Sequence, residues 1–223
     1  AQPLKFNFLR FYQTASYNII RSFYVGVGYY LDSYSKIEDE KLRLNEGDSL
    51  ITSHYAYSKN YGFDEKQYAA SAIGVNVVSD TLDNMVNPYK GHFAMISGSG
   101  ALKFLGSTKY ASFFSMEWRS FHFFTHRNPR HLLAFWLMAD ASPEGVLPYL
   151  VLPATAYDKR SRSGRGYSQA RFRGNQHVYG EAEYRFPISE CGGIWGGVLF
   201  LNATSANNPQ QSLNLFESVK PGY

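Results

Sequence analysis

The chain has 223 residues and a mass of 25.3 kDa, enough for one large domain with a sizeable core. Charged residues make up 18% of it and aromatic residues 17%, which excludes an intrinsically disordered protein, because disorder needs high charge and few aromatics. A helical membrane bundle is also excluded, because no apolar run approaches about 18 residues and the mean hydropathy is −0.32. The net charge of +4 is scattered along the chain, so we expect no nucleic-acid partner.

Alternating apolar and polar residues, separated by turn signals, predict an all-β protein with almost no convincing amphipathic helix. In chain order, the expected strands are 4–16, 23–32, 69–79, 92–104, 112–122, 131–140, 177–187 and 193–203. One exception is residues 38–48, which we expect to form a short solvated helix in the first long connection.

The polar faces of these strands distinguish two all-β folds. A soluble sandwich or a lipocalin-like barrel turns its apolar face inward, whereas a membrane barrel turns it to lipid and can hold charged side chains in a wet interior. Glu181, Glu183 and Arg185 share one face of the strand at 177–187. This pattern favours the membrane barrel.

The lengths of the connections support the same fold. Two connections, 33–66 and 141–175, are much longer than the others, and both fall at the same end if the strands run up and down. Outer-membrane barrels show this asymmetry, with tight periplasmic turns and long outer loops. Loops of this length are uncommon inside a compact soluble domain.

Three motifs in the later part of the chain carry a family resemblance. They are the triplet Arg165-Gly166-Tyr167 in the second long loop, the strand that ends Glu183-Tyr184-Arg185-Phe186-Pro187, and an Asp-Asn…Pro…Gly turn upstream. In this order, over roughly residues 79–202, they resemble the C-terminal barrel of the BamA/TamA superfamily, also called the bacterial surface antigen family. The residues that match the family's periplasmic turn are Asp80, Asp83, Asn84, Pro88 and Gly91.

The resemblance implies that the Arg-Gly-Tyr loop folds back into the barrel and is held there as a latch. Arg165 would lie in the interior, where a carboxylate can bind its planar guanidinium through two hydrogen bonds, and Glu183 is the expected partner. In relatives an Asp on the following strand also takes part, and Asn202 stands at that position here. The change removes a charge, so the anchor would rest on Glu183 and Glu181.

The resemblance further implies an antiparallel transmembrane β-barrel in the outer membrane of a Gram-negative bacterium. Family barrels have sixteen strands, and the visible segments look like the sixth to the thirteenth. Residues 1–223 would then be a single barrel domain that is incomplete at both ends, with closure as a small eight-stranded barrel as the alternative. The expected partners are outer-membrane lipid and lipopolysaccharide, together with other outer-membrane or periplasmic proteins.

The expected function is non-covalent and related to the assembly and translocation of outer-membrane proteins. The alternative is a passive accessory barrel, or a membrane anchor for a separate domain of the patatin-like lipase type. We expect no enzyme, because the chain contains no Gly-x-Ser-x-Gly elbow, and no cofactor. His122 and His126 flank a turn that leads to His131, and we expect no metal site there because the segment shows no credible helix that would place histidines four residues apart on one face. The single cysteine, Cys191, cannot form an intramolecular disulfide.

Overall fold

The computed structural model describes residues 3–44, 50–124, 130–158, 162–189, 195–207 and 214–223. Its elements in chain order are β1 (Leu4–Ile20), β2 (Phe23–Asp39), α1 (Ser53–Tyr61), β3 (Tyr68–Asp80), β4 (Gly91–Ala101), η1 (Lys103–Leu105), β5 (Ala111–Phe123), β6 (Leu132–Ala141), η2 (Tyr149–Val151), β7 (Gln176–Pro187), β8 (Gly196–Ala206) and β9 (Lys220–Gly222). None of the helices in these ranges is long and apolar enough to cross a bilayer.

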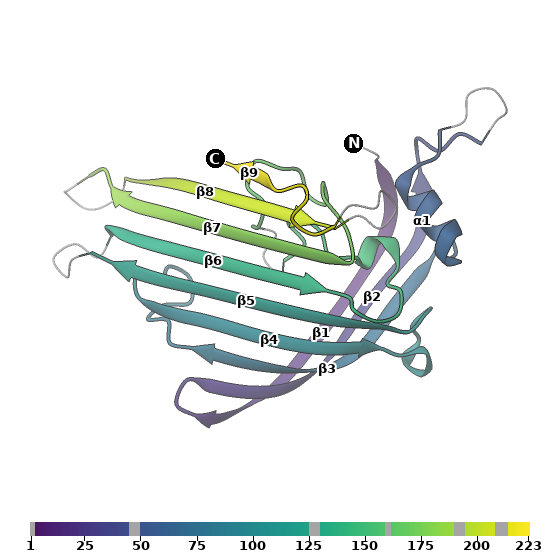
Figure 1. Ribbon diagram of the computed structural model, residues 1–223. Coiled ribbons are helices and arrows are strands. Elements are labelled where there is room, and N and C mark those ends of the chain that lie inside the picture. Colours follow the sequence, from purple (N-terminus) through teal and green to yellow (C-terminus); the bar gives the residue numbers. More distant parts are fainter. Residues whose placement is uncertain (1–2, 45–49, 125–129, 159–161, 190–194, 208–213) are drawn as a thin grey trace.

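The strands form one antiparallel sheet in which every strand pairs with its neighbours in sequence, in the order β1 to β9 (Figure 1). All eight predicted strands are present, and the short β9 is an additional ninth that pairs with Asn202–Thr204 of β8. The sheet is strongly curved, and α1 and η2 of the two long connections lie next to each other at one end of the strands (Figure 1). In the described part of the chain, no ladder joins β1 to β8 or β9, so closure into an eight-stranded barrel is not observed.

The first two strands are longer than the sequence pattern predicts. Each has 17 residues, and they are joined only by Arg21 and Ser22. A strand of about 9–11 residues crosses a bilayer, so part of this hairpin extends beyond that length. Near the end of β2 the alternation of apolar and polar residues is interrupted, because Lys36 has a φ of +52° and the β1–β2 register shifts there.

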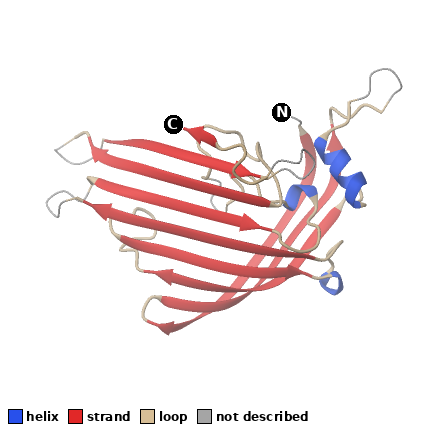
Figure 2. Ribbon diagram, in the orientation of Figure 1, coloured by secondary structure: helices blue, strands red, loops and turns tan. Residues whose placement is uncertain are grey.

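The helix expected at residues 38–48 is wrong for residues 38–44, and residues 45–48 lie outside the described residues. Residues 38 and 39 end β2, and Arg43 forms an isolated bridge with Leu50. The helix of this connection is α1, Ser53–Tyr61, with Thr52 and Gly62 as its caps. Figure 2 shows how little helix the chain holds beside its strands. Thr52 accepts a hydrogen bond from the backbone N–H of Tyr55, and Gly62 has the left-handed conformation that commonly ends helices.

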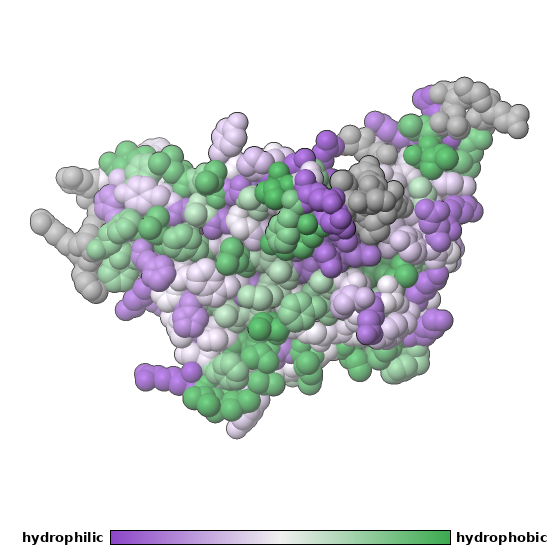
Figure 3. All heavy atoms as spheres, viewed as in Figure 1, coloured by the Kyte–Doolittle hydropathy of each residue, from purple (hydrophilic) through white to green (hydrophobic). Residues whose placement is uncertain are grey.

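Outward apolar and inward charged side chains distinguish the two faces of the sheet. Val75 and Leu199 are 59% and 64% exposed, whereas Glu181 and Glu183 are 7% and 4% exposed. Figure 3 shows broad hydrophobic patches on the visible surface over the sheet. In water this distribution would expose a large apolar area, and lipid is the solvent in which it is favourable.

The main apolar cluster lies at one end of the sheet, where α1 and η2 pack against the long strands. It includes Tyr34 of β2, Tyr57 of α1 and Leu150 of η2. The hydroxyl of Tyr57 donates to the carbonyl of Leu147 at 2.9 Å, which joins the two long connections. His54 of α1 is buried in this cluster, and burial lowers its pKa because the charged imidazolium loses hydration. The long connections therefore close this end as a packed cap.

Candidate functional site

The candidate site begins with the inward face of β7 and β8. Because successive side chains of a strand point to opposite faces, Glu181, Glu183 and Arg185 all lie on the interior side. Asn202 of β8 is directly paired with Glu181 and is buried beside it. Two neighbouring strands thus present two carboxylates, a guanidinium and an amide to the interior.

The connection between β6 and β7 turns back toward these groups. Its two arms pair where the backbone N–H of Thr155 donates to Phe172 and that of Ala170 donates to Thr155. Between these arms, Asp158 accepts hydrogen bonds from the backbone N–H and the hydroxyl of Ser163. Gly164 follows with a φ of +72°, and a Cβ there would lie 2.2 Å from Thr155 Cγ2, so only glycine fits.

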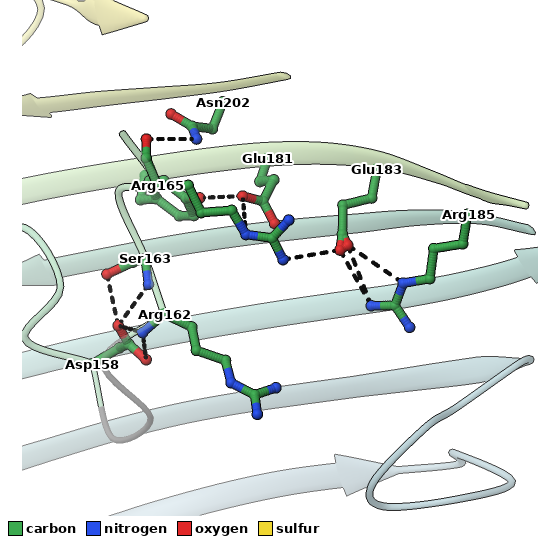
Figure 4. Close-up of polar contacts among 9 residues, drawn as sticks. Asp158, Arg162, Ser163, Arg165, Glu181, Glu183, Arg185 and Asn202 are labelled. Atoms are coloured by element: carbon green, nitrogen blue, oxygen red, sulfur yellow. Dashed lines mark hydrogen bonds and ion pairs between the residues drawn. The ribbon is translucent and has the colours of Figure 1, made fainter. Parts of the chain in front are cut away.

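Arg165 extends from this loop to both carboxylates (Figure 4). Its Nη2 donates to Glu183 Oε1 at 3.1 Å, and its Nε lies 3.5 Å from Glu181 Oε2. Its guanidinium also stacks over the ring of Phe200 of β8, 4.9 Å from the ring centre. The structure therefore brings together Arg165 with the two glutamates that the sequence analysis paired with it.

The other predicted latch residues join the loop to β8 and β9. The Asn202 amide donates to the carbonyl of Arg165 at 3.2 Å, so the asparagine binds the loop backbone rather than the guanidinium. The hydroxyl of Tyr167 donates to the carbonyl of Pro221 in β9 at 2.5 Å. Gly166 has a φ of +89°, a conformation that glycine adopts without strain.

The predicted turn between β3 and β4 is held by side-chain oxygens that accept backbone N–H groups. Asp80 accepts from Leu82, Asp83 accepts from Tyr89 and Lys90, and Asn84 accepts from Val86 and Asn87. Gly91 closes the turn with a φ of +100°, and a Cβ there would lie 2.3 Å from the carbonyl oxygen of Thr81. Pro88 lies in the same turn and lines an interior cavity. These bonds are the ordinary means by which Asp and Asn stabilise turns.

Arg185 connects the turn to the latch and was not among the predicted site residues. It forms hydrogen bonds with both carboxylate oxygens of Glu183, and its Nη1 lies 3.5 Å from Asn87 Oδ1. Tyr179 extends the chain of contacts at the other end by donating to Glu181 at 2.5 Å. The alternation of residues 177–187 puts Tyr179 and Arg185 on the same face as the two glutamates, and this pattern could have identified them as site residues.

A second interior ion pair, also missed, lies on β1 and β2. Arg10 binds both oxygens of Asp32, at 2.7 and 3.0 Å, and the Tyr12 hydroxyl donates to the same carboxylate at 2.6 Å. The three residues line an interior cavity of about 360 Å³. Asp32 on the polar face of an alternating strand was the available signal, but its partner on β1 depends on a long-range pairing.

The sequence analysis also considered three histidines and the single cysteine. His122 contacts the hydroxyl of Ser120 at 2.6 Å, and His131 contacts that of Tyr184 at 3.0 Å, whereas His126 and Cys191 lie outside the described residues. Among the described residues, no group of three or more His, Cys, Asp or Glu side chains is arranged to hold a metal ion.

The antiparallel sheet, with apolar side chains on its outer face and charged side chains on its inner face, has the fold of a transmembrane β-barrel. The structure is similar to the crystal structure of BamA from Haemophilus ducreyi lacking POTRA domains 1-3, with a TM-score of 0.65 and 16% sequence identity. The match covers 94% of this chain and 46% of that chain, so this chain spans less than half of the structure it matches. No family model matches the sequence, and the search of curated proteins finds no match. At this identity the likeness shows a BamA-like barrel fold.

Proposed function

We propose that this chain is part of an outer-membrane β-barrel of a Gram-negative bacterium, related to the machinery that assembles or translocates outer-membrane proteins. The observation that carries the proposal is the loop that contains Arg165-Gly166-Tyr167, in which Arg165 reaches Glu181 and Glu183 inside a BamA-like sheet. The proposed partners are outer-membrane lipid, lipopolysaccharide and the proteins that the barrel handles. The proposed action is non-covalent and has no catalytic residue.

In this proposal the loop is a latch that controls the rigidity of the barrel wall. Arg165 has two carboxylate partners on β7. Asn202 of β8 binds the backbone carbonyl of Arg165, and Tyr167 of the loop binds the backbone carbonyl of Pro221 in β9. One loop therefore holds β7, β8 and β9 together from the interior. Release of Arg165 would loosen all three strands at once, which is a way to open a wall without breaking covalent bonds.

We also propose that residues 1–223 contribute one side of a wider barrel. Lipid cannot hydrogen-bond the exposed backbone groups of a sheet edge, so an open sheet in a bilayer needs further strands at its edges. The described sheet is open between β1 and β9, and its counterpart in the matched structure is part of a longer chain.

The assembly role predicts that vesicles containing this protein accelerate the folding of a client barrel. A urea-unfolded eight-stranded outer-membrane protein would be added to vesicles that carry the full chain, and its folding followed by gel mobility without heating. We expect a severalfold faster rate than in vesicles that carry Arg165→Ala, or an equal amount of an unrelated barrel. A rate equal to that of the unrelated barrel would contradict the assembly role and favour the alternative of a passive membrane anchor.

A further inference from the structure

A small cavity in the barrel interior lies beside the latch and is lined by arginine. It has a volume of about 80 Å³, room for a few water molecules or one small ion. Its charged lining consists of Arg119, Arg162, Arg165, Arg185, Glu181 and Glu183. Leu82, Met85 and Val86 of the turn between β3 and β4 also line it.

Cations outnumber anions around this cavity. Arg165 and Arg185 are bound to Glu183, and Arg119 forms an ion pair with Glu117, which is also buried. Arg162 is different. Its backbone N–H bonds to Asp158, but among the described residues its guanidinium has no hydrogen bond or ion pair (Figure 4). Four guanidinium groups and two carboxylates line the cavity. Glu117 lies outside this lining and pairs with Arg119, and Asp158 accepts from the backbone of Arg162, which is an exposed residue, so the guanidinium of Arg162 is the one left without a counter-charge among the described residues.

The lining also holds more hydrogen-bond donors than acceptors. Trp136 is 9% exposed, and within the described part of the chain its indole N–H has no partner. Nε of Arg119, whose guanidinium lies 4.8 Å from the centre of the Trp136 ring, is buried without a partner as well. Both groups can only donate. The carboxylates of the lining already accept from Tyr179, Arg165 and Arg185.

We propose that this cavity is a binding site for one phosphate-type oxyanion. Such an ion offers only acceptors and carries negative charge, and guanidinium groups bind it through paired hydrogen bonds. It would supply an acceptor to the unpartnered donors and a counter-charge to Arg162. The cavity admits a free ion rather than the headgroup of a two-chain lipid, whose acyl chains would have to pass through the interior.

The site would strengthen the latch, because the bound anion would lie among the arginines that hold the loop and the turn. Arg162 and Arg165 belong to the loop, Arg185 belongs to β7, and Arg119 belongs to β5. An anion between them would link three parts of the interior. This inference goes beyond the proposed function and does not require assembly activity, so the two can fail separately.

Calorimetric titration of the full chain with inorganic phosphate tests the proposal, in a phosphate-free maltoside detergent and a phosphate-free buffer. We expect one phosphate per chain with a dissociation constant at or below about 1 mM. Arg162→Gln should weaken binding about tenfold or more. Arg162→Lys keeps the charge but loses the paired guanidinium donors, so it should weaken binding less. Arg171→Gln is the matched control, because Arg171 is an exposed arginine of the same loop that does not line the cavity. Its affinity should equal that of the parent.

Three results would overturn the proposal. The first is no saturable phosphate binding by the folded parent protein. The second is equal weakening by Arg162→Gln and Arg171→Gln, which would mean diffuse attraction to a basic loop. The third is binding of a short-chain phosphatidic acid without binding of inorganic phosphate, which would identify a lipid headgroup as the ligand. Gel mobility without heating verifies that each variant is folded, and Arg162→Gln should fold because its guanidinium forms no hydrogen bond or ion pair with a described residue.

Discussion

Arg165→Ala is expected to lower the temperature at which the folded protein loses its gel mobility, while the strand content stays unchanged. The substitution leaves the buried carboxylates of Glu181 and Glu183 without their shared cation, and Arg185 remains as the partner of Glu183 alone. Breaking a buried ion pair costs about 3–5 kcal/mol, and the partial exposure of Arg165 reduces this to about 2–3 kcal/mol, or about 5–10 °C. The β7–β8 ladder does not involve the side chain, so circular dichroism at 25 °C should not change.

Arg171→Ala is the control for this experiment, because it removes the same kind of side chain from an exposed position of the same loop. Its transition should match that of the parent within about 2 °C, as expected for a surface substitution. Glu183→Gln provides a second check. If Arg165 acts through Glu183, the double variant should lose less stability than the sum of the two single variants. Equal transitions for the parent and Arg165→Ala would show that the loop is not a latch.

Leu199→Arg should strongly reduce the fraction of protein that folds into lipid vesicles. Leu199 lies on the outward face of β8, where lipid would surround it. An arginine on the lipid face of a barrel costs about 2–4 kcal/mol near the bilayer midplane, whereas the same change on a water-exposed face usually costs less than about 0.5 kcal/mol. Urea denaturation in vesicles, followed by gel mobility, measures the difference.

Leu44→Arg is the matched control for the lipid-face substitution. Leu44 is 59% exposed, close to the 64% of Leu199, but it lies in the connection after β2 rather than in the sheet. Its unfolding midpoint in urea should be that of the parent. Equal midpoints for Leu199→Arg and Leu44→Arg would mean that both positions face water.

The sequence predicted the strands and the contents of the barrel interior because a strand alternates with a period of two residues. That period assigns Glu181, Glu183 and Arg185 to one face of their strand and separates Leu199 and Leu201 from Asn202 on the next strand. The contact of Arg165 with these carboxylates lies beyond such reasoning, because the two are joined by a loop with no regular period. The prediction of that contact came from the family resemblance.

The helix at 38–48, the ninth strand and the Arg10–Asp32 ion pair were mispredicted or missed, each for a physical reason. Charged residues at 38–48 suggested a helix, although the residues that cap the observed helix are Thr52 and Gly62. Ninth-strand pairing involves only three residues, one of them Pro221, which has no N–H to give to a ladder. Arg10 and Asp32 meet across a β1–β2 register that is visible only when both strands are built.

The inverted polarity of the sheet is the claim on which the proposed function depends, and spin labels at single cysteines test it most directly. In a Cys191→Ser background, labels would replace the outward residues Val75 and Leu201 and the inward residues Asn76 and Thr204. In lipid vesicles we predict that the outward labels collide mainly with oxygen, which concentrates in the bilayer, and the inward labels with a water-soluble nickel complex. Nickel collisions that are equal at all four positions, or stronger at Val75 and Leu201, would contradict the membrane barrel.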